Sequence, residues 1–325
     1  MEVVPGLIVP VSPVPVLSFQ TVEFNAHDLR KHANYSFTIN SAGYKMVTVK
    51  NVNGVSDGDY YLGNYSSGPN HLDRLCAGLA ASSSPSNPIC TVPSKEQSVP
   101  ACSRSGNKCF DYKDGTWSVD GNSMAQGVVW FEGDLNLKNG NYFNTFIATG
   151  NIQTSGSHQT TAPNYAGYYK QDGLGHGMCS SLVFPGYFPT QFCQAGSYNY
   201  NASGGIGNYA LMAGSCDPNY SASCRYVGGN ITTGGSSVFR GAIKAGNEFV
   251  SGGSTTTRGY ISALGLGEQR TNSSMGGSTE IDLTELPTGY DPSGGAGNSG
   301  GGDGDGGGGD ESGSGRARIL WSRYL

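Results

Sequence analysis

The chain has 325 residues, of which 52 are glycine, and a formal net charge of −5. Hydrophobic residues make up 36% and charged residues 13%, whereas globular domains average about 45–50% and about 25%. Coiled coils and helical bundles are excluded because they are rich in Ala, Glu, Lys and Leu, and an acidic chain is not expected to bind nucleic acid. Tyrosine, with 19 residues, outnumbers the 12 phenylalanines and 3 tryptophans together. We expect a turn-rich, all-β protein with a thin core.

Residues 1–17 are apolar but carry prolines at positions 5, 10, 13 and 15. This spacing prevents a continuous helix, and no basic residues precede the apolar run as they would in a signal peptide. We predict an extended Pro-rich segment that does not span a membrane. An exported chain would then have lost its leader or anchor.

Residues 18–125 predict a small β region. Apolar and polar residues alternate in 19–24, 35–40 and 44–52, as in half-buried strands. Residues 71–81 (HLDRLCAGLAA) predict one short helix, and the Ser/Pro/Cys-rich stretch 82–125 predicts loops held by disulfides.

The eight cysteines fall in four close sequential pairs, and none forms the C-x-x-C motif of zinc ribbons or thioredoxins. We predict short-loop disulfides between neighbours, although many other connectivities are formally open. Disulfides indicate an oxidising setting outside the cytoplasm. The predicted pairs are Cys76 with Cys90, Cys102 with Cys109, Cys179 with Cys193, and Cys216 with Cys224.

A short repeat starts near residue 127. Gly-Asp or Gly-Asn recurs twice with a 17-residue step, from Gly133 to Gly150 and from Gly229 to Gly246. A fifth copy, GYISA from Gly259, follows the similar string GAIKA from Gly241 by 18 residues. One column stands three residues before each glycine and contains Trp130, Ile147, Tyr226 and Ile243. A second column stands four residues after it and contains Leu137, Thr154, Thr233 and Val250.

A 17-residue unit is too short for a helical solenoid and suits one coil of a right-handed β-helix, which we place at residues 126–292. Coils would stack about 4.8 Å apart, with the first column forming a ladder that faces inward. Gly and Asn tolerate the positive φ of a sharp corner, and stacked Asn side chains can hydrogen-bond from coil to coil.

An insertion at about residues 156–224 separates the two repeat pairs and carries four cysteines and many tyrosines. Loops that leave one face of a solenoid often form its binding face. The candidate ligand-contacting aromatics are Tyr165, Tyr168, Tyr169 and Tyr187. The alternative is that these tyrosines only pack against the side of the β-helix.

The C-terminal part predicts a linker and a strand. Residues 294–315 hold 13 glycines in 22 residues, and we assign 293–315 as a flexible linker. Residues 316–325 (RARILWSRYL) alternate well enough for a final strand. This strand would either return and dock on the fold or engage a partner.

The strings GVVWFEGDLNL (127–137), TFIATGNIQTSG (145–156) and GAIKAGNEFVSGG (241–253) resemble bacterial exported proteins associated with type IV and MSHA-type pilus assembly. Those proteins look like single-stranded right-handed β-helices that end in a short Trp-containing strand, which residues 319–322 fit. The resemblance covers under half of the chain. It implies a surface or pilus-associated role without established catalytic residues.

The sharpest catalytic candidate is the pair Glu132 and Asp134. Residues i and i+2 share a face of a strand, so the two carboxylates could act as a hydrolase pair on sugars. Asp134, however, occupies the corner position that Asn151 and Asn230 fill elsewhere, which favours a structural role.

We therefore expect an extracellular or cell-surface bacterial protein that is structural or adhesive, without catalysis, cofactor or metal. Its partners would be pilus or surface proteins or glycans. One alternative is a β-helical enzyme that degrades polysaccharides. Another is a filament or pilus-tip subunit that self-associates.

Overall fold

The computed structural model describes residues 24–64, 73–91, 102–103, 109–168, 176–179, 184, 186–194, 197–198, 205–220, 224–267, 273–283 and 286. These residues are mostly in β-strands, which confirms the all-β class. The predicted Pro-rich segment 1–17, residues 19–23 of the predicted strand at 19–24, the linker at 293–315 and the strand at 316–325 lie outside the described residues.

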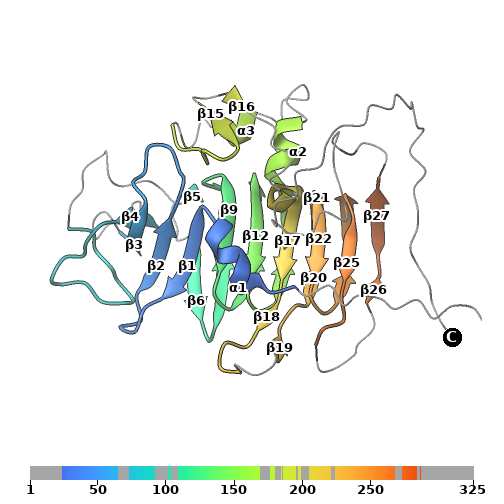
Figure 1. Ribbon diagram of the computed structural model, residues 1–325, viewed down its shortest axis with the longest axis horizontal. Helices are drawn as coiled ribbons and strands as arrows, with labels where there is room; N and C mark the ends of the chain where they lie inside the picture. Colours follow the sequence, from blue (N-terminus) through green and yellow to red (C-terminus); the bar gives the residue numbers. More distant parts are fainter. Residues whose placement is uncertain are drawn as a thin grey trace, which may run out of the picture.

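From Gly127 onward the chain visits three parallel sheets in a fixed order, and we call one passage through all three a circuit (Figure 1). The first sheet holds β9 (Gly127–Phe131), β12 (Asn144–Ala148), β17 (Tyr209–Ala213), β22 (Ala242–Ala245) and β25 (Ile261–Ala263). The second holds β10 (Asp134–Leu137), β13 (Ile152–Thr154), β20 (Ile231–Thr233), β23 (Phe249–Ser251) and β26 (Ser274–Met275). The third holds β11 (Gly140–Tyr142), β14 (Ser157–Thr161), β21 (Ser236–Arg240), β24 (Ser254–Arg258) and β27 (Ser278–Asp282).

The predicted 17-residue step sets the register of the first two circuits. Trp130 pairs with Ile147, and Leu137 pairs with Thr154. The step later lengthens, because Glu248 adds one residue after the corner and Ile231 pairs with Phe249. The prediction that Val250 continues the second column is therefore wrong, and Ser251 takes that place opposite Thr233.

The inward ladder predicted through Trp130 is also wrong. The column runs from Trp130 through Ile147 to Met212, Lys244 and Ser262. It lies on the outer face of the first sheet, and the N-terminal helix α1 (Ala26–Leu29) packs against its start, where the Trp130 indole N–H donates to the Ala26 carbonyl at 2.8 Å.

Tyr226 and Ile243 were predicted in that same ladder but have different places. Tyr226 lies in β19 (Tyr226–Val227), which pairs antiparallel with β18 (Ser215–Cys216) outside the three sheets. Ile243 does face inward, one residue out of phase with Trp130, because alternate strand residues point to opposite faces.

The core inside the three sheets changes character along the stack of circuits. Near β9 it is aromatic, and the Phe37 ring stacks on Phe131 and Phe110 at centroid distances of 4.6 and 4.8 Å. Towards β27 the inward side chains become small and hydroxylated. These buried residues are Thr233, Ser237, Ser251, Thr255 and Thr257.

Antiparallel strands cover the aromatic end. β1 (Tyr35–Ile39) pairs in parallel with β9, and its other side continues antiparallel into β2 (Lys45–Val49), β3 (Gly58–Gly63) and β4 (Arg74–Cys76). Strands were predicted at 35–40 and 44–52, and both are confirmed. The second sheet is extended by the hairpin of β6 (Phe110–Lys113) and β7 (Thr116–Val119), and a small pair is formed by β5 (Cys102–Ser103) and β8 (Ser123–Met124).

Two local predictions in this region are wrong. Residues 74–76 form a strand rather than a helix, because pairing of Leu62 with Leu75 buries both side chains. The supposed loop 82–125 contains four strands, since Phe110 and Trp117 enter the aromatic core. In both places burial in the tertiary structure outweighs local propensity.

The predicted insertion at 156–224 is divided, since β14 and β17 belong to the circuits. One excursion carries α2 (Pro163–Tyr168), α3 (His176–Cys179), β15 (Cys193–Gln194), β16 (Ser197–Tyr198) and η3 (Gly205–Asn208). The other excursion contains β18 and β19. In Figure 1 it lies at the bottom of the first sheet's strands, whereas the excursion with α2, α3, β15 and β16 lies at the top. In the described parts of the chain, no helix has the length and apolar character to cross a membrane.

Candidate functional site

All four predicted disulfides are present, namely Cys76–Cys90, Cys102–Cys109, Cys179–Cys193 and Cys216–Cys224. The first three pairs are buried, whereas Cys216 and Cys224 are accessible to solvent. Four disulfides are consistent with folding in an oxidising environment.

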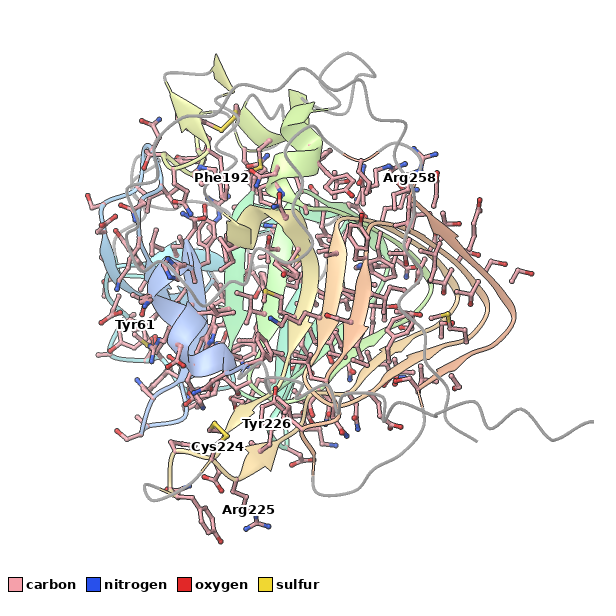
Figure 2. All side chains as sticks on the ribbon, turned by 45° about the vertical axis from the view of Figure 1, so that its right-hand side comes forward. Tyr61, Phe192, Cys224, Arg225, Tyr226 and Arg258 are labelled. Atoms are coloured by element: carbon pink, nitrogen blue, oxygen red, sulfur yellow. A yellow bond between two sulfur atoms is a disulfide. The ribbon has the colours of Figure 1, made fainter. Side chains whose placement is uncertain are left out.

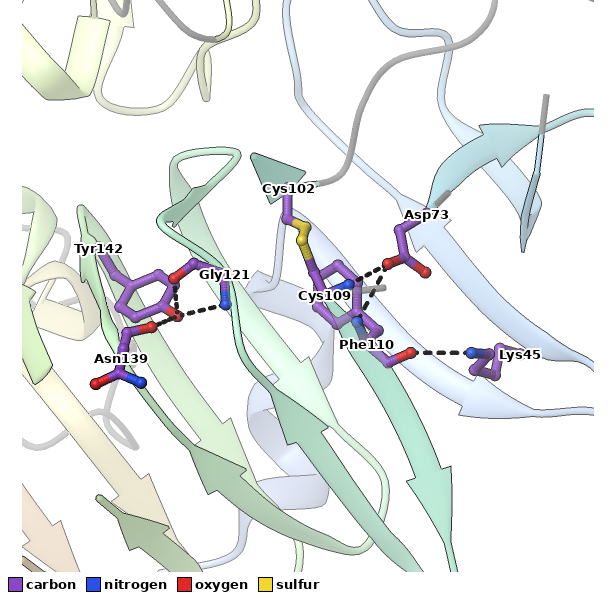
Figure 3. The surroundings of a disulfide bond; sticks show 8 residues. All are labelled: Lys45, Asp73, Cys102, Cys109, Phe110, Gly121, Asn139 and Tyr142. Atoms are coloured by element: carbon purple, nitrogen blue, oxygen red, sulfur yellow. Dashed lines mark hydrogen bonds between the residues drawn. A yellow bond between two sulfur atoms is a disulfide. The ribbon is translucent and has the colours of Figure 1, made fainter. Parts of the chain in front are cut away.

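A buried carboxylate lies beside one of these disulfides (Figure 3). The Asp73 side chain accepts hydrogen bonds from the backbone N–H groups of Cys109 and Phe110, the second at 3.3 Å. The Lys45 ammonium donates to the Phe110 carbonyl at 3.0 Å. Asp73, Cys102 and Cys109 are close enough to suggest metal ligands, but both sulfurs are bonded to each other, so this cluster anchors the β6 strand.

The repeated Gly-Asx corners form a ladder of hydrogen bonds. The Asn230 N–H donates to Oδ1 of Asn151 at 3.0 Å, and the Asn247 amide donates to Oδ1 of Asn230 at 2.8 Å. The ladder ends where the Gly267 N–H donates to Oδ1 of Asn247 at 3.2 Å. The coil-to-coil bonding expected from the sequence is therefore present at these corners.

The ladder includes Asp134, one of the two carboxylates proposed above as a catalytic pair with Glu132. Oδ1 of Asp134 accepts from both the backbone and the side chain of Asn151, so Asp134 is the first rung. Glu132 is exposed on the preceding strand end, and its backbone carbonyl accepts from the Trp117 indole at 3.0 Å. The Asp134 carboxylate thus has a structural role in corner geometry.

The sequence analysis missed a second corner, between the second and third sheets. Here Gly-Gly-Ser recurs, and Gly156, Gly235, Gly253 and Gly277 stack with φ near +70°. A Cβ on Gly235 would lie 2.3 Å from the Gly156 carbonyl oxygen. The repeated T/S/M-G-G-S-S/T strings at 233–237, 251–255 and 275–279 were the available signal.

The predicted ligand-contacting tyrosines are not brought together on the surface. Tyr165 is fully buried and packs with Ala162 and Leu286, so its prediction as a contact residue is wrong. Tyr187 is half-buried against the main core. The Tyr168 side chain and all of Tyr169 lie outside what the structure describes.

An exposed aromatic occurs instead on the loop closed by Cys216–Cys224, which with β18 and β19 we call the finger (215–227). Tyr220 is 50% exposed, and the Arg225 guanidinium lies 5.1 Å from its ring centroid and donates to its hydroxyl at 2.8 Å. Val227 is 38% exposed beside them. Figure 2 shows Arg225 at the outer end of the finger, away from the sheets.

An open depression lies beside α1 on the described part of the surface. It mixes three bases with two acids and a histidine, namely Arg30, Lys31, Lys50, Asp28, Asp59 and His27. Arg30 lies 5.0 Å from the Trp130 ring, and Asp59 accepts from Thr48 at 2.6 Å. Burial lowers the pKa of His27, although the nearby Glu132 and Asp28 oppose this shift. These contacts serve packing of α1 and β2.

Two basic side chains are buried away from the finger. Desolvation lowers the pKa of His158 to about 4, while its Nδ1 lies 2.9 Å from the Lys138 carbonyl and its Nε2 2.6 Å from the Thr160 hydroxyl. Since a carbonyl only accepts, Nδ1 carries the proton of the neutral ring. Burial also lowers the pKa of Lys244, whose ammonium lies 5.2 Å from the Phe24 ring centroid.

No family model, no curated protein and no solved structure matches the chain.

Proposed function

We propose that the three parallel sheets form a right-handed β-helix. The fixed order in which the strands enter the sheets supports this, as do the 17- and 18-residue steps of the register. The Asn ladder and the stacked glycines supply the corners that such a fold needs.

We further propose an extracellular, surface- or pilus-associated binding module without catalysis, consistent with the pilus-family resemblance. The four disulfides fit secretion. The hydrogen bonds from Asn151 to Asp134 support a structural role for that carboxylate rather than one in hydrolysis.

The observation that carries the binding role is the Tyr220–Arg225 pair on a disulfide-closed finger. Tyr and Arg are enriched among residues that dominate binding energy, and an aromatic face stacks well on sugars and protein groups. The short disulfide loop limits the conformational entropy lost on binding. We propose surface proteins or glycans as partners.

The test compares the double variant Tyr220→Ser/Arg225→Ser with Lys113→Ser, which removes an exposed cation from another hairpin. Binding to bacterial cells and to immobilised neutral and acidic glycans is measured with the purified chain. We expect at least a tenfold loss for the double variant only. Equal binding of both variants would overturn the role of the finger, and release of reducing ends from the glycans would favour the alternative of a polysaccharide-degrading enzyme.

A further inference from the structure

The two ends of the stack of circuits differ. At the first end, β1 to β4 and the β6–β7 hairpin continue the sheets and cover the aromatic core. At the other end, β25, β26 and β27 each pair with one neighbour among the described residues, and nothing described there covers them. Stacked folds need a polar cap on each terminal unit, and an open strand edge is a template for a further strand.

The uncovered end exposes side chains that belong to core columns. Met275 pairs with Ser251, and Ile281 pairs with Thr257. Ser251 and Thr257 are 3% and 0% exposed, whereas Met275 and Ile281 are each 40% exposed. The last circuit therefore presents an apolar surface at the point where another layer would bury it.

We propose that residues 316–325 of the same chain cover this end by adding a strand beside β27. Strand addition supplies main-chain hydrogen bonds, while alternate side chains select the partner. In RARILWSRYL the alternate residues Ala317, Ile319 and Trp321 are apolar. These three would lie over Met275 and Ile281.

The charges of the two segments favour residues 316–325 as the added strand over an uncharged apolar peptide. β27 carries Glu280 and Asp282 and no basic residue, and β25 and β26 are uncharged. Asp282 already pairs with Arg258 of β24 at 3.5 Å, so the exposed Glu280 is the acidic residue offered to a further strand. Residues 316–325 carry three arginines and no acid. Opposite charges on neighbouring strands favour pairing.

The connection is long enough. Leu286, the last described residue, packs against Ala162 and Tyr165 beside β14, and β14 is separated from β27 by β21 and β24 in the third sheet. A strand added beyond β27 is four strand spacings from β14, which corresponds to about 19 Å. Residues 287–315 form a Gly-rich connection of 29 residues, for which a root-mean-square span of about 30 Å is expected. Such tethering gives a millimolar effective concentration.

The experiment uses the full chain and hydrogen exchange read by mass spectrometry. Ile319→Asp/Trp321→Asp should speed exchange of the 278–282 amides at least tenfold. On the receiving side, Glu280→Lys should do the same by charge repulsion, and Ile281→Lys by loss of apolar contact. Val227→Lys is the matched control, because Val227 is similarly exposed at 38% but lies on the finger.

A synthetic RARILWSRYL peptide is then titrated into the Ile319→Asp/Trp321→Asp chain, where it should bind one to one and restore protection. A peptide of the same composition in scrambled order should not. Unchanged exchange in all variants together with no peptide binding would overturn the proposal. Oligomers of the wild-type chain that the Ile319→Asp/Trp321→Asp change dissociates would overturn it in favour of a second copy. The exchange and peptide measurements do not involve the finger, so they test this proposal independently of the binding function proposed for the finger.

Discussion

Asn151 donates twice to one oxygen of Asp134, through its backbone N–H at 2.6 Å and its side-chain amide at 3.1 Å. This contact joins two consecutive circuits at the same corner, and the Asn230 backbone N–H then donates to Oδ1 of Asn151. Asp134, which the sequence offers as one half of a catalytic carboxylate pair, is thus the first residue of a structural ladder of hydrogen bonds.

The first prediction concerns this ladder. Asn151→Ala should lower the free energy of unfolding by about 1–2 kcal/mol, because it removes the side-chain donor to Asp134 and leaves the Asn230 N–H without its acceptor. Asn151→Asp should cost more at pH 7, since two carboxylates would then meet, and the difference should shrink in acid. Asp134→Asn is the control and should be tolerated, because it recreates the corner found at the other circuits. Urea denaturation at pH 7 and pH 4 measures all three, and a strongly destabilised Asp134→Asn would contradict the assignment.

The second prediction separates steric from conformational demands on glycine. Gly235 and Gly265 both have positive φ, at +72° and +63°, but only Gly235 has a carbonyl oxygen where a Cβ would lie. Gly265→Ala should cost about 1–2 kcal/mol from the left-handed backbone alone. Gly235→Ala should cost a further 1–3 kcal/mol because the neighbouring circuit must move. Equal costs in thermal unfolding would show that the stacked glycines are not in close contact.

The third prediction is a dependence of stability on pH. The pKa of buried His158 is lowered to about 4, and in the unfolded chain it returns to its ordinary value near 6.5. Between those values protons bind the unfolded chain preferentially, so stability is full above pH 6.5 and is lost as the pH falls towards 4. The total loss is about 3 kcal/mol.

His158→Gln should remove that part of the acid sensitivity. His27→Gln is the matched control, because His27 is only partly buried and its shift, also downward, has opposing causes. Denaturation series from pH 4 to pH 8 measure the slopes. Parallel slopes for wild type and His158→Gln would contradict the role assigned to the buried ring.

The fourth prediction distinguishes the disulfides. Replacing both Cys102 and Cys109 by Ser should cost about 2–4 kcal/mol, because this buried bridge closes a loop at the edge of the aromatic core. Replacing Cys216 and Cys224 should leave the melting temperature nearly unchanged, since that bridge closes a solvent-facing loop, yet it should weaken binding through the finger. A large drop in melting temperature for the second pair would show that the finger supports the fold.

Local signals in the sequence are enough for the parts that depend on near neighbours. The strands at 35–39 and 45–49 follow from alternation. The four bridges follow from pairing each cysteine with its neighbour. The step of 17 follows from the Gly-Asx corners, which need a particular backbone conformation at each turn.

The side that a strand buries does not follow from the repeat. Trp130 and Ile147 are apolar at the repeat spacing, but Val129 and Phe146 are apolar too. The first pair faces outward and is buried in a second apolar cluster that α1 and the excursion with α2 and α3 help to form. The repeat also does not predict β17. This strand lies between two excursions and is followed by Gly214-Ser215 rather than by a Gly-Asp or Gly-Asn corner.

For the candidate binding tyrosines too, the sequence and the tertiary structure decide different things. The sequence marks the Tyr-rich excursions, but only packing decides which tyrosine is accessible. Tyr165 is buried under Leu286, whereas Tyr220 stands on the finger with Arg225.

By itself, the sequence determined the all-β class, the circuit length and the disulfide pairs, because glycine backbone freedom and short cysteine spacing are local properties. The tertiary structure decided the inward and outward faces, the place of β17, and the uncovered last circuit at Met275 and Ile281. These depend on which distant segment lies against each strand, and burial of apolar surface, which drives that choice, is set by contacts far apart in the chain.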